Sequence, residues 1–246
     1  MSTTTTVARR EIRTYFNSPV AYIVVMVFML ISGYLFFNQL FLEKQAELRY
    51  YFTLTPLIFT FIIPAITMRL IAEEKGSGTL EMLITMPVRD WEVVLGKFLA
   101  GMAMLGAIVG MTMFYGITVA VLGPIDRGPL ITGYLGLLLM GGSYVAIGVM
   151  ASSLTRNQIV AFILAFAISF GFFIFGQIVQ FAPDWLAPVL AYLSMGNHFE
   201  SFSRGVVDSR DALFYLSLIA VAWSSPRRPS NRASGSNGRE LPHVDF

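Results

Sequence analysis

Five long apolar segments constrain the fold more than any other feature of this sequence. They cover about residues 20–37, 53–72, 98–122, 131–151 and 159–181. A helix needs about 20 mostly apolar residues to cross the hydrocarbon core of a bilayer. Only 13% of the 246 residues are charged, which is about half the usual share in a soluble domain. We therefore predict an all-α integral membrane protein.

A sixth apolar segment, residues 212–223, is short for a transmembrane helix. A helix of about 12 residues rises only about 18 Å, so a crossing requires a locally thin membrane or a helix that begins near Val206. With this segment included, we predict a six-helix transmembrane bundle whose sixth span is short or truncated. The predicted membrane-spanning domain covers residues 1–223.

The apolar pattern stops after Ala222, and residues 224–246 are rich in Ser, Arg, Pro and Gly. A change of this kind in the middle of an apolar segment fits a reading-frame change or an artificial end. A naturally disordered cytoplasmic tail is the alternative. A truncated sixth span would weaken both the last helix and any dimer.

The basic residues favour an orientation with both termini in the cytoplasm. Cytoplasmic segments of membrane proteins are enriched in Lys and Arg, and this orientation places most of the 17 such residues on the cytoplasmic side. Basic residues precede the first apolar segment, but no small-residue cleavage pattern follows it. We expect a retained signal-anchor helix.

Residues 6–17, ahead of the first span, have helical periodicity. Their apolar side chains share one face, whereas Arg9, Arg10 and Arg13 share another. This pattern is typical of a helix in the cytoplasmic membrane interface, with its arginines near anionic headgroups. An ordinary solvated N-terminus is the alternative.

The connection between the second and third spans, residues 69–97, carries the most informative pattern. Charged residues 73–75 end the second helix on the cytoplasmic side, and the Gly-Ser-Gly sequence at 76–78 is expected to form a flexible break. Thr79 can cap a short amphipathic helix that must stop before Pro87. A cytoplasmic partner could bind such a helix; alternatively, the connection only packs on the bundle.

No motif for catalysis or for nucleotide or metal binding stands out. The glycines of the connection lack the spacing of a phosphate-binding loop, the sequence has no Cys, and neither His198 nor His243 lies in a predicted span. Asn197, His198 and Glu200 offer too few ligands for a metal site and fit an interfacial anchor or a helix cap better. The span centres hold almost no ionisable residues, which disfavours a proton-coupled transporter. We expect no enzyme activity, no cofactor and no nucleic-acid partner for this chain.

One cytoplasmic segment resembles a known family. Residues 73–101 read EEKGSGTLEMLITMPVRDWEVVLGKFLAG, and this run resembles the cytoplasmic connection of ABC-2-type transporter permeases. It is most similar to the gliding-motility-associated and nitrous-oxide-reductase-maturation branches. The basic N-terminal helix, the six spans and the long outer loop before the last span agree with the resemblance, which covers about residues 7–219.

The resemblance implies the transmembrane subunit of an ABC transporter that exports or extrudes a substrate from a bacterial inner membrane. A separate cytoplasmic ATPase subunit would bind ATP and Mg²⁺. A second copy of the chain or a paralogue would pair with it, with or without an auxiliary membrane subunit. An ATPase-independent membrane scaffold or channel subunit is the alternative, and an intramembrane enzyme is a distant third.

The resemblance also implies which residues couple the ATPase to the membrane domain. Residues 79–86 would form a coupling helix, and Arg9, Arg10 and Arg13 would lie beside the ATPase on the interfacial helix. The predicted coupling residues are Glu73, Glu74, Lys75, Gly76, Gly78, Thr79, Leu80, Glu81, Leu83 and Pro87.

Overall fold

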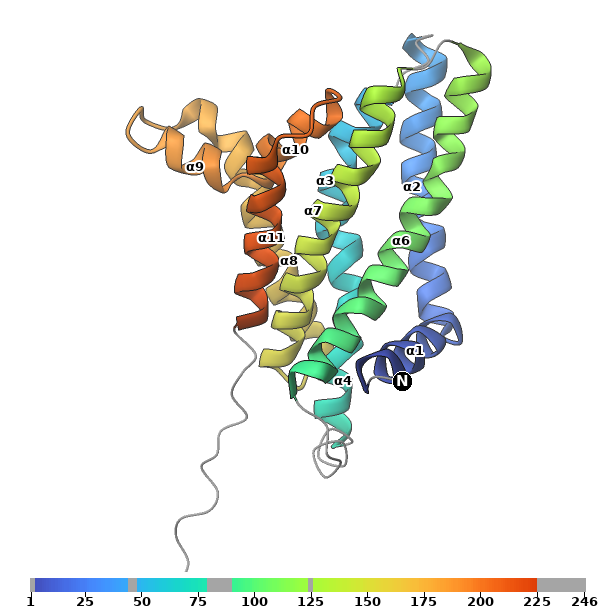
Figure 1. The fold of residues 1–246 in the computed structure, drawn as a ribbon, viewed down its shortest axis with the longest axis vertical. Helices are drawn as coiled ribbons and strands as arrows, with labels where there is room; N and C mark the ends of the chain where they lie inside the picture. The colour runs from blue at the N-terminus through green and yellow to red at the C-terminus, as the bar shows by residue number, and fades with distance from the viewer. Residues whose placement is uncertain (1–2, 44–47, 79–89, 124–125, 225–246) are drawn as a thin grey trace, which may run out of the picture.

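A computed structural model describes residues 3–43, 48–78, 90–123 and 126–224, and this part of the chain contains helices and no strands (Figure 1). The elements are α1 (Thr3–Phe16), α2 (Pro19–Glu43), α3 (Arg49–Thr67), α4 (Arg69–Ser77), α6 (Asp90–Leu122), α7 (Arg127–Leu154), α8 (Gln158–Ile178), η1 (Val179–Phe181), α9 (Ala187–Leu193), α10 (Met195–Ser203) and α11 (Ser209–Ser224). The predicted coupling helix and tail residues 225–246 lie outside the described residues.

Five helical segments within the described residues are long and apolar enough to cross a membrane. They are Pro19–Leu42, Arg49–Ser77, Trp91–Leu122, Arg127–Leu154 and Gln158–Phe181. Each contains one of the five long predicted segments, so the prediction of an all-helical membrane protein is confirmed. Helix α11 has 16 residues and rises about 24 Å. It is not among the five, and a sixth crossing stays a prediction.

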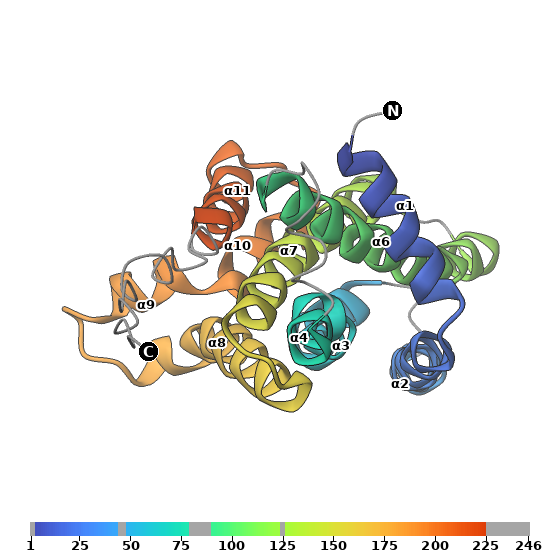
Figure 2. The same cartoon turned by 90° about the horizontal axis from the view of Figure 1, so that it is seen from below.

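Helix α7 is the centre of the bundle (Figures 1 and 2), with α3, α6, α8, α10 and α11 packed around it. In its most apolar 18-residue stretch 78% of the residues are buried, against 22% in α2 and 17% in α8. Glycines of α7 allow this close approach. A Cβ atom on Gly133 would overlap the ring of Phe52, and one on Gly148 would overlap the hydroxyl of Thr67. Small residues at such contacts are typical of helix packing in membranes.

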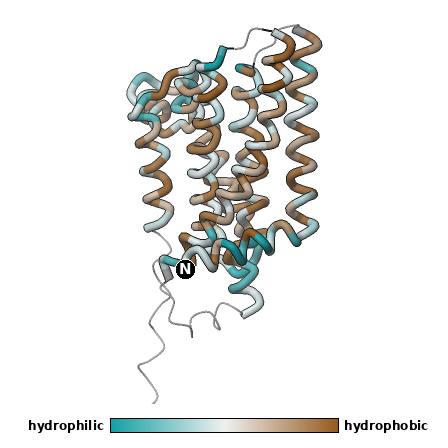
Figure 3. Tube along the Cα trace, turned by 45° about the vertical axis from the view of Figure 1, so that its right-hand side comes forward, coloured by the Kyte–Doolittle hydropathy of each residue, from teal (hydrophilic) through white to brown (hydrophobic). Residues whose placement is uncertain are grey.

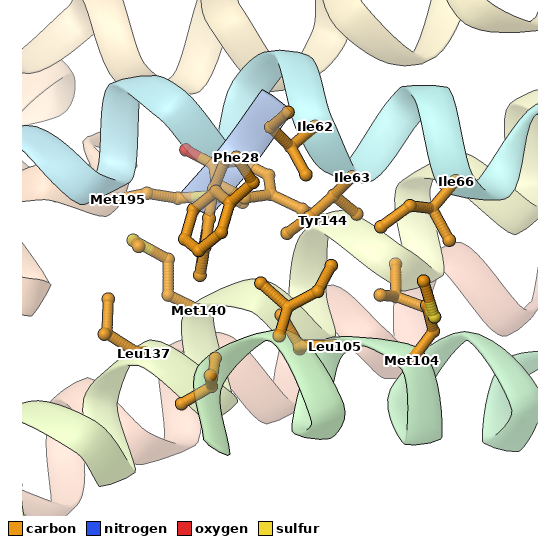
Figure 4. Close-up of a cluster of buried hydrophobic side chains, with 14 of the residues drawn as sticks. Phe28, Ile62, Ile63, Ile66, Met104, Leu105, Leu137, Met140, Tyr144 and Met195 are labelled. Atoms are coloured by element: carbon orange, nitrogen blue, oxygen red, sulfur yellow. The ribbon is translucent and has the colours of Figure 1, made fainter. Parts of the chain in front are cut away.

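Apolar side chains from several helices meet inside the bundle (Figure 4). Phe28 of α2, Ile63 of α3, Leu105 of α6 and Tyr144 of α7 are almost completely buried there. Lipid tails are as apolar as these side chains, so the helices are held by van der Waals packing rather than by removal from water.

Hydrophilic residues gather at both ends of the bundle, and α1 lies across one of them (Figures 1 and 3). We call this the basal end. Helix α1 packs along α6, where a Cβ atom on Gly96 would lie 2.8 Å from Cγ1 of Val7. Helix α4 extends α3 at the same end, whereas α9 and α10 lie at the opposite, distal end. Helix α1 covers most of the predicted interfacial helix, and its contact with a membrane interface stays a prediction.

Candidate functional site

A buried lysine joins three helices at the basal end. The side chain of Lys97 on α6 is only 1% exposed, and its Nζ lies 3.1 Å from Oε1 of Glu11 on α1 and 2.9 Å from Oε2 of Glu74 on α4. Nζ also donates a hydrogen bond to the carbonyl oxygen of Leu70 at 2.5 Å. A buried charge without such partners is costly. Lys97 and its two carboxylates, which we call the basal junction, therefore link α1, α4 and α6.

A second ion pair lies beside the basal junction. Arg69 donates to both carboxylate oxygens of Glu73, from Nε at 2.8 Å and from Nη2 at 3.2 Å. Its Nη1 donates to Oγ of Ser18, between α1 and α2, at 3.2 Å. Bidentate contacts of this kind are typical of arginine–carboxylate pairs. Because both side chains are partly exposed, the pair contributes about 0–1 kcal/mol and mainly orients α4 against the α1–α2 turn.

A serine of α7 is inserted where α3 gives way to α4. The two helices are separated only by Met68. Oγ of Ser152 accepts hydrogen bonds from the backbone N–H groups of Ile71 and Ala72, at 3.0 and 2.9 Å, and donates to the carbonyl of Met68 at 2.9 Å. A side chain inserted into the helical hydrogen-bond ladder is a known cause of helix breaks. Ser152 thus satisfies the backbone at the break and positions α4.

A hydrogen bond from Tyr15 joins α1 to α3. Its hydroxyl donates to the carbonyl oxygen of Ile66 at 2.8 Å. Burial raises the pKa of the Tyr15 phenol well above its usual value, because a low-dielectric environment disfavours the phenolate. The hydroxyl is therefore a hydrogen-bond donor throughout the physiological pH range.

The end of α4 is held against the turn between α7 and α8. Nζ of Lys75 donates to the carbonyl oxygen of Ser153. Gly76 lies so close to this turn that a Cβ atom on it would be 2.8 Å from the carbonyl oxygen of Arg156. A larger residue at position 76 would therefore push α4 away from the bundle.

The Gly-Ser-Gly sequence at residues 76–78 is more regular than its composition suggests. The predicted flexible break is wrong for Gly76 and Ser77, which are helical. Oγ of Ser77 donates to the carbonyl of Glu73 at 2.9 Å inside the last turn. Only Gly78 leaves the helix, with φ of +74°, a left-handed conformation that favours glycine. Contacts with the α7–α8 turn outweigh the low helix propensity of glycine.

Five of the ten predicted coupling residues lie in the part of the chain that the structure describes. The residues on α4 or at its end are Glu73, Glu74, Lys75, Gly76 and Gly78. Glu74 and Lys75 bind partners within the chain, whereas the side chain of Glu73 is 46% exposed. The residues outside the described part are Thr79, Leu80, Glu81, Leu83 and Pro87. Docking of either half to an ATPase stays a prediction.

The three arginines predicted on the interfacial helix lie on the exposed face of α1. Nη2 of Arg10 is 3.9 Å from Oε1 of Glu74, at the edge of the basal junction. In the described residues, no carboxylate pairs with Arg9 or Arg13. These two cations therefore remain available to a partner of the basal end.

Sequence reasoning missed the two residues that organise this end. Lys97 belongs to the apolar run VVLGKFLAG, and a single ionisable residue among apolar neighbours was the available signal, since such residues in membrane segments are expensive and usually paired. Ser152 carries no comparable signal. Nothing in its sequence neighbourhood indicates that its hydroxyl reaches another helix.

At the distal end, the Asn197, His198 and Glu200 cluster forms contacts within the chain. Nδ1 of His198 lies 2.7 Å from Oδ1 of Asp211, and Nε2 lies 2.9 Å from the carbonyl oxygen of Tyr192. Glu200 of α10 pairs with Arg204, which directly follows the end of that helix. Among the residues that the structure describes, no group of three or more His, Cys, Asp or Glu side chains could hold a metal ion.

Comparison with known proteins gives two kinds of match. Residues 15–223 match the family described as "ABC-2 family transporter protein". The chain is also 27% identical over 176 residues to the "Probable multidrug ABC transporter permease YbhR" of Escherichia coli strain K12, and equally to its counterpart in Escherichia coli O157:H7. The aligned region covers 70% of this chain and 45% of each relative, so the chain spans about half the length of the curated relatives it matches. These matches do not single out the gliding-motility or nitrous-oxide branch.

Proposed function

The chain belongs to the ABC-2 transporter family, and we propose that it is the transmembrane subunit through which a separate cytoplasmic ATPase drives export across a bacterial inner membrane. Family membership and the five apolar helices make it a multi-pass transporter subunit. The proposal adds the ATPase, the direction of transport, the inner membrane and a cytoplasmic location for both termini. ATP and Mg²⁺ would bind to the partner chain.

The basal junction is the observation that carries the proposal. Helix α4 precedes residues 79–89 and α6 follows them, and Lys97 of α6 contacts both α4 and α1. A displacement of the intervening residues 79–89 would therefore act on three helices at once. Coupling of this kind requires elements that move as units, and short polar contacts between helices favour such movement.

The contacts of α4 suggest a division of roles among the predicted coupling residues. We assign docking to residues 79–86 and to the exposed Glu73, because these side chains are predicted or observed at the surface. Arg9 and Arg13 on α1 would lie beside the ATPase. Glu74 would instead position α4, because its carboxylate is engaged by Lys97. The predicted coupling helix would thus connect to α4, which is held in position by its contact with Lys97.

A second permease, either a copy of this chain or a paralogue, would complete the transport pathway. Helices α2 and α8 expose most of their apolar surface, with 22% and 17% of their central stretches buried. Lipid or a second permease could cover them. The "multidrug" description belongs to the relatives, and it makes small amphiphilic compounds the first substrates to test.

The test is purification of the chain from its native membrane in mild detergent, followed by an assay for bound ATPase. We expect an ATPase subunit in a fixed ratio, and its loss on the charge reversal Glu81→Lys in the predicted coupling helix. Glu200→Lys, at the distal end, is the matched control and should retain the ATPase. A folded chain that carries no ATPase from intact membranes would instead favour a scaffold or channel subunit.

A further inference from the structure

A cavity of about 250 Å³ lies beside the basal junction. Residues of α1, α2, α3, α4 and α6 line it, and we call it the basal cavity. Its polar wall includes Arg10, Thr14 and Glu73, and its apolar wall includes Val24 and Ile66. The cavity therefore suits an amphiphile that has a polar and an apolar end.

The carboxylates of the basal cavity are already paired with cations. Glu73 binds Arg69, and Glu11 and Glu74 both bind Lys97. Arg69 and Lys97 compensate two of these three negative charges, and Arg10, whose Nη2 lies 3.9 Å from Oε1 of Glu74, offsets the third. A cationic ligand would have to compete with arginine and lysine groups already in place.

The rim of the basal cavity, in contrast, carries exposed positive charge. Arg10 and Thr14 also line a shallow depression on α1, together with Arg9 and Arg13. Neither Arg9 nor Arg13 has a carboxylate partner within the described residues. Planar guanidinium groups in such a cluster match the oxygens of a phosphate.

The position of the basal cavity points to the bilayer as the source of its ligand. Helix α1 lies across the end of the bundle, and α2 rises from it as a candidate span (Figures 1 and 2). Val20 lines the cavity, and the neighbouring Tyr22 and Ile23 are more than half exposed on α2. The apolar wall is thus continuous with the surface that faces lipid tails. Basic residues beside such a surface are typical of anionic lipid recognition.

We propose that the basal cavity binds one anionic phospholipid. Its phosphate lies at Arg10 with Arg9 or Arg13, and one acyl chain enters along Val24 and Ile66. Bound in this way, the lipid fills the space between α1 and α2 and stabilises α1 against the basal junction. The site requires no ATPase, so it can be tested independently of the proposed function.

The test is lipid binding by the purified full chain, measured by native mass spectrometry with phosphatidylglycerol and with phosphatidylcholine of the same acyl chains. We expect one tightly held phosphatidylglycerol and weaker binding of phosphatidylcholine. Arg10→Gln should weaken phosphatidylglycerol binding about fivefold, the effect of one arginine near an anionic headgroup. Ala65→Phe, which fills the apolar wall, should also weaken it.

Two variants outside the cavity serve as matched controls. Arg127→Gln removes an exposed arginine, and Ala120→Phe adds the same ring at an exposed position on α6. Both should bind phosphatidylglycerol like the unaltered chain. The proposal is wrong if the controls weaken binding as much as the cavity variants, or if both lipids bind equally. Full competition by inorganic phosphate would show a simple anion site instead.

A second measurement applies if the Arg10 variant does not fold. Photoactivatable phosphatidylglycerol is bound to the unaltered chain, irradiated and located by peptide mass spectrometry. We expect cross-links concentrated in the peptides of α1 and the start of α2. Cross-links spread evenly over the exposed faces of α2 and α8 would contradict a discrete site.

Discussion

The middle of the bundle and its basal end are held together by different interactions. In the middle, glycines of α7 bring helices into direct contact, as at Gly141 and Leu105. At the basal end, a buried ammonium group and its carboxylates join the helices instead. The first region depends on shape and the second on charge compensation. We infer that the middle moves as a packed unit, while the basal end attaches α1 and α4 to it.

The largest expected loss of stability follows from replacing Lys97 in the basal junction. Lys97→Met leaves Glu11 and Glu74, whose side chains are only 13% and 17% exposed, without the lysine that pairs with both. Removing one partner of a buried ion pair costs about 3–5 kcal/mol. Unfolding of the purified chain by denaturant in mixed micelles should show a loss of this size.

A triple variant separates charge from packing in this result. Glu11→Gln and Glu74→Gln, added to Lys97→Met, remove the uncompensated charges and should recover much of the lost stability, because buried ion pairs can often be replaced by neutral groups. A triple variant as unstable as the single one would show that shape, not charge, dominates at the basal end too.

The middle of the bundle should lose stability when one carbon atom is added to a glycine of α7. Gly141→Ala places a Cβ atom 2.7 Å from Cδ2 of Leu105, and overpacking of this kind costs about 1–3 kcal/mol. Gly106→Ala is the matched control on α6, since a Cβ atom there has nothing within 4 Å. Thermal unfolding should separate the two variants, and equal melting temperatures would refute the role of close packing in α7.

Ser152 connects the two regions, and its replacement should cause a moderate loss of stability. Ser152→Ala removes the hydrogen bonds to the α3–α4 break, and unsatisfied buried backbone groups cost about 1–3 kcal/mol. Amide hydrogen exchange at Ile71 and Ala72 should become faster. Ser217→Ala is the control, because that hydroxyl bonds only within its own helix; unchanged exchange in Ser152→Ala would contradict the positioning role.

The smallest change in stability is expected at the exposed edge of the basal end. Glu73→Gln breaks a partly exposed pair with Arg69 and should cost about 0–1 kcal/mol. Glu200→Gln breaks the equivalent pair with Arg204 at the distal end. Both variants should unfold like the unaltered chain, but only Glu73→Gln should reduce ATPase capture. Equal capture by both would remove Glu73 from the docking surface.

Length and composition were sufficient to predict the long helices, because a bilayer requires long apolar segments whatever their neighbours. They were insufficient where a side chain reaches another helix. Lys97 could be recognised as unusual, but its partners lie 86 and 23 positions away in the chain. Ser152 gave no signal, and Gly76 and Ser77 are helical through contacts with a distant turn. The structure of the basal end therefore depends on contacts between residues that are distant in the sequence, and the local sequence pattern does not reveal them.

The most direct test of the account is ATP hydrolysis by the purified complex of this chain and its ATPase in nanodiscs. Residues 79–86 are replaced by a Gly/Ser linker of equal length, and helical content and melting temperature verify the fold. We predict that the unaltered chain stimulates hydrolysis above the rate of the isolated ATPase, and that the linker variant abolishes this stimulation. Unchanged stimulation with the linker in place would contradict the assignment of residues 79–86 as the coupling element.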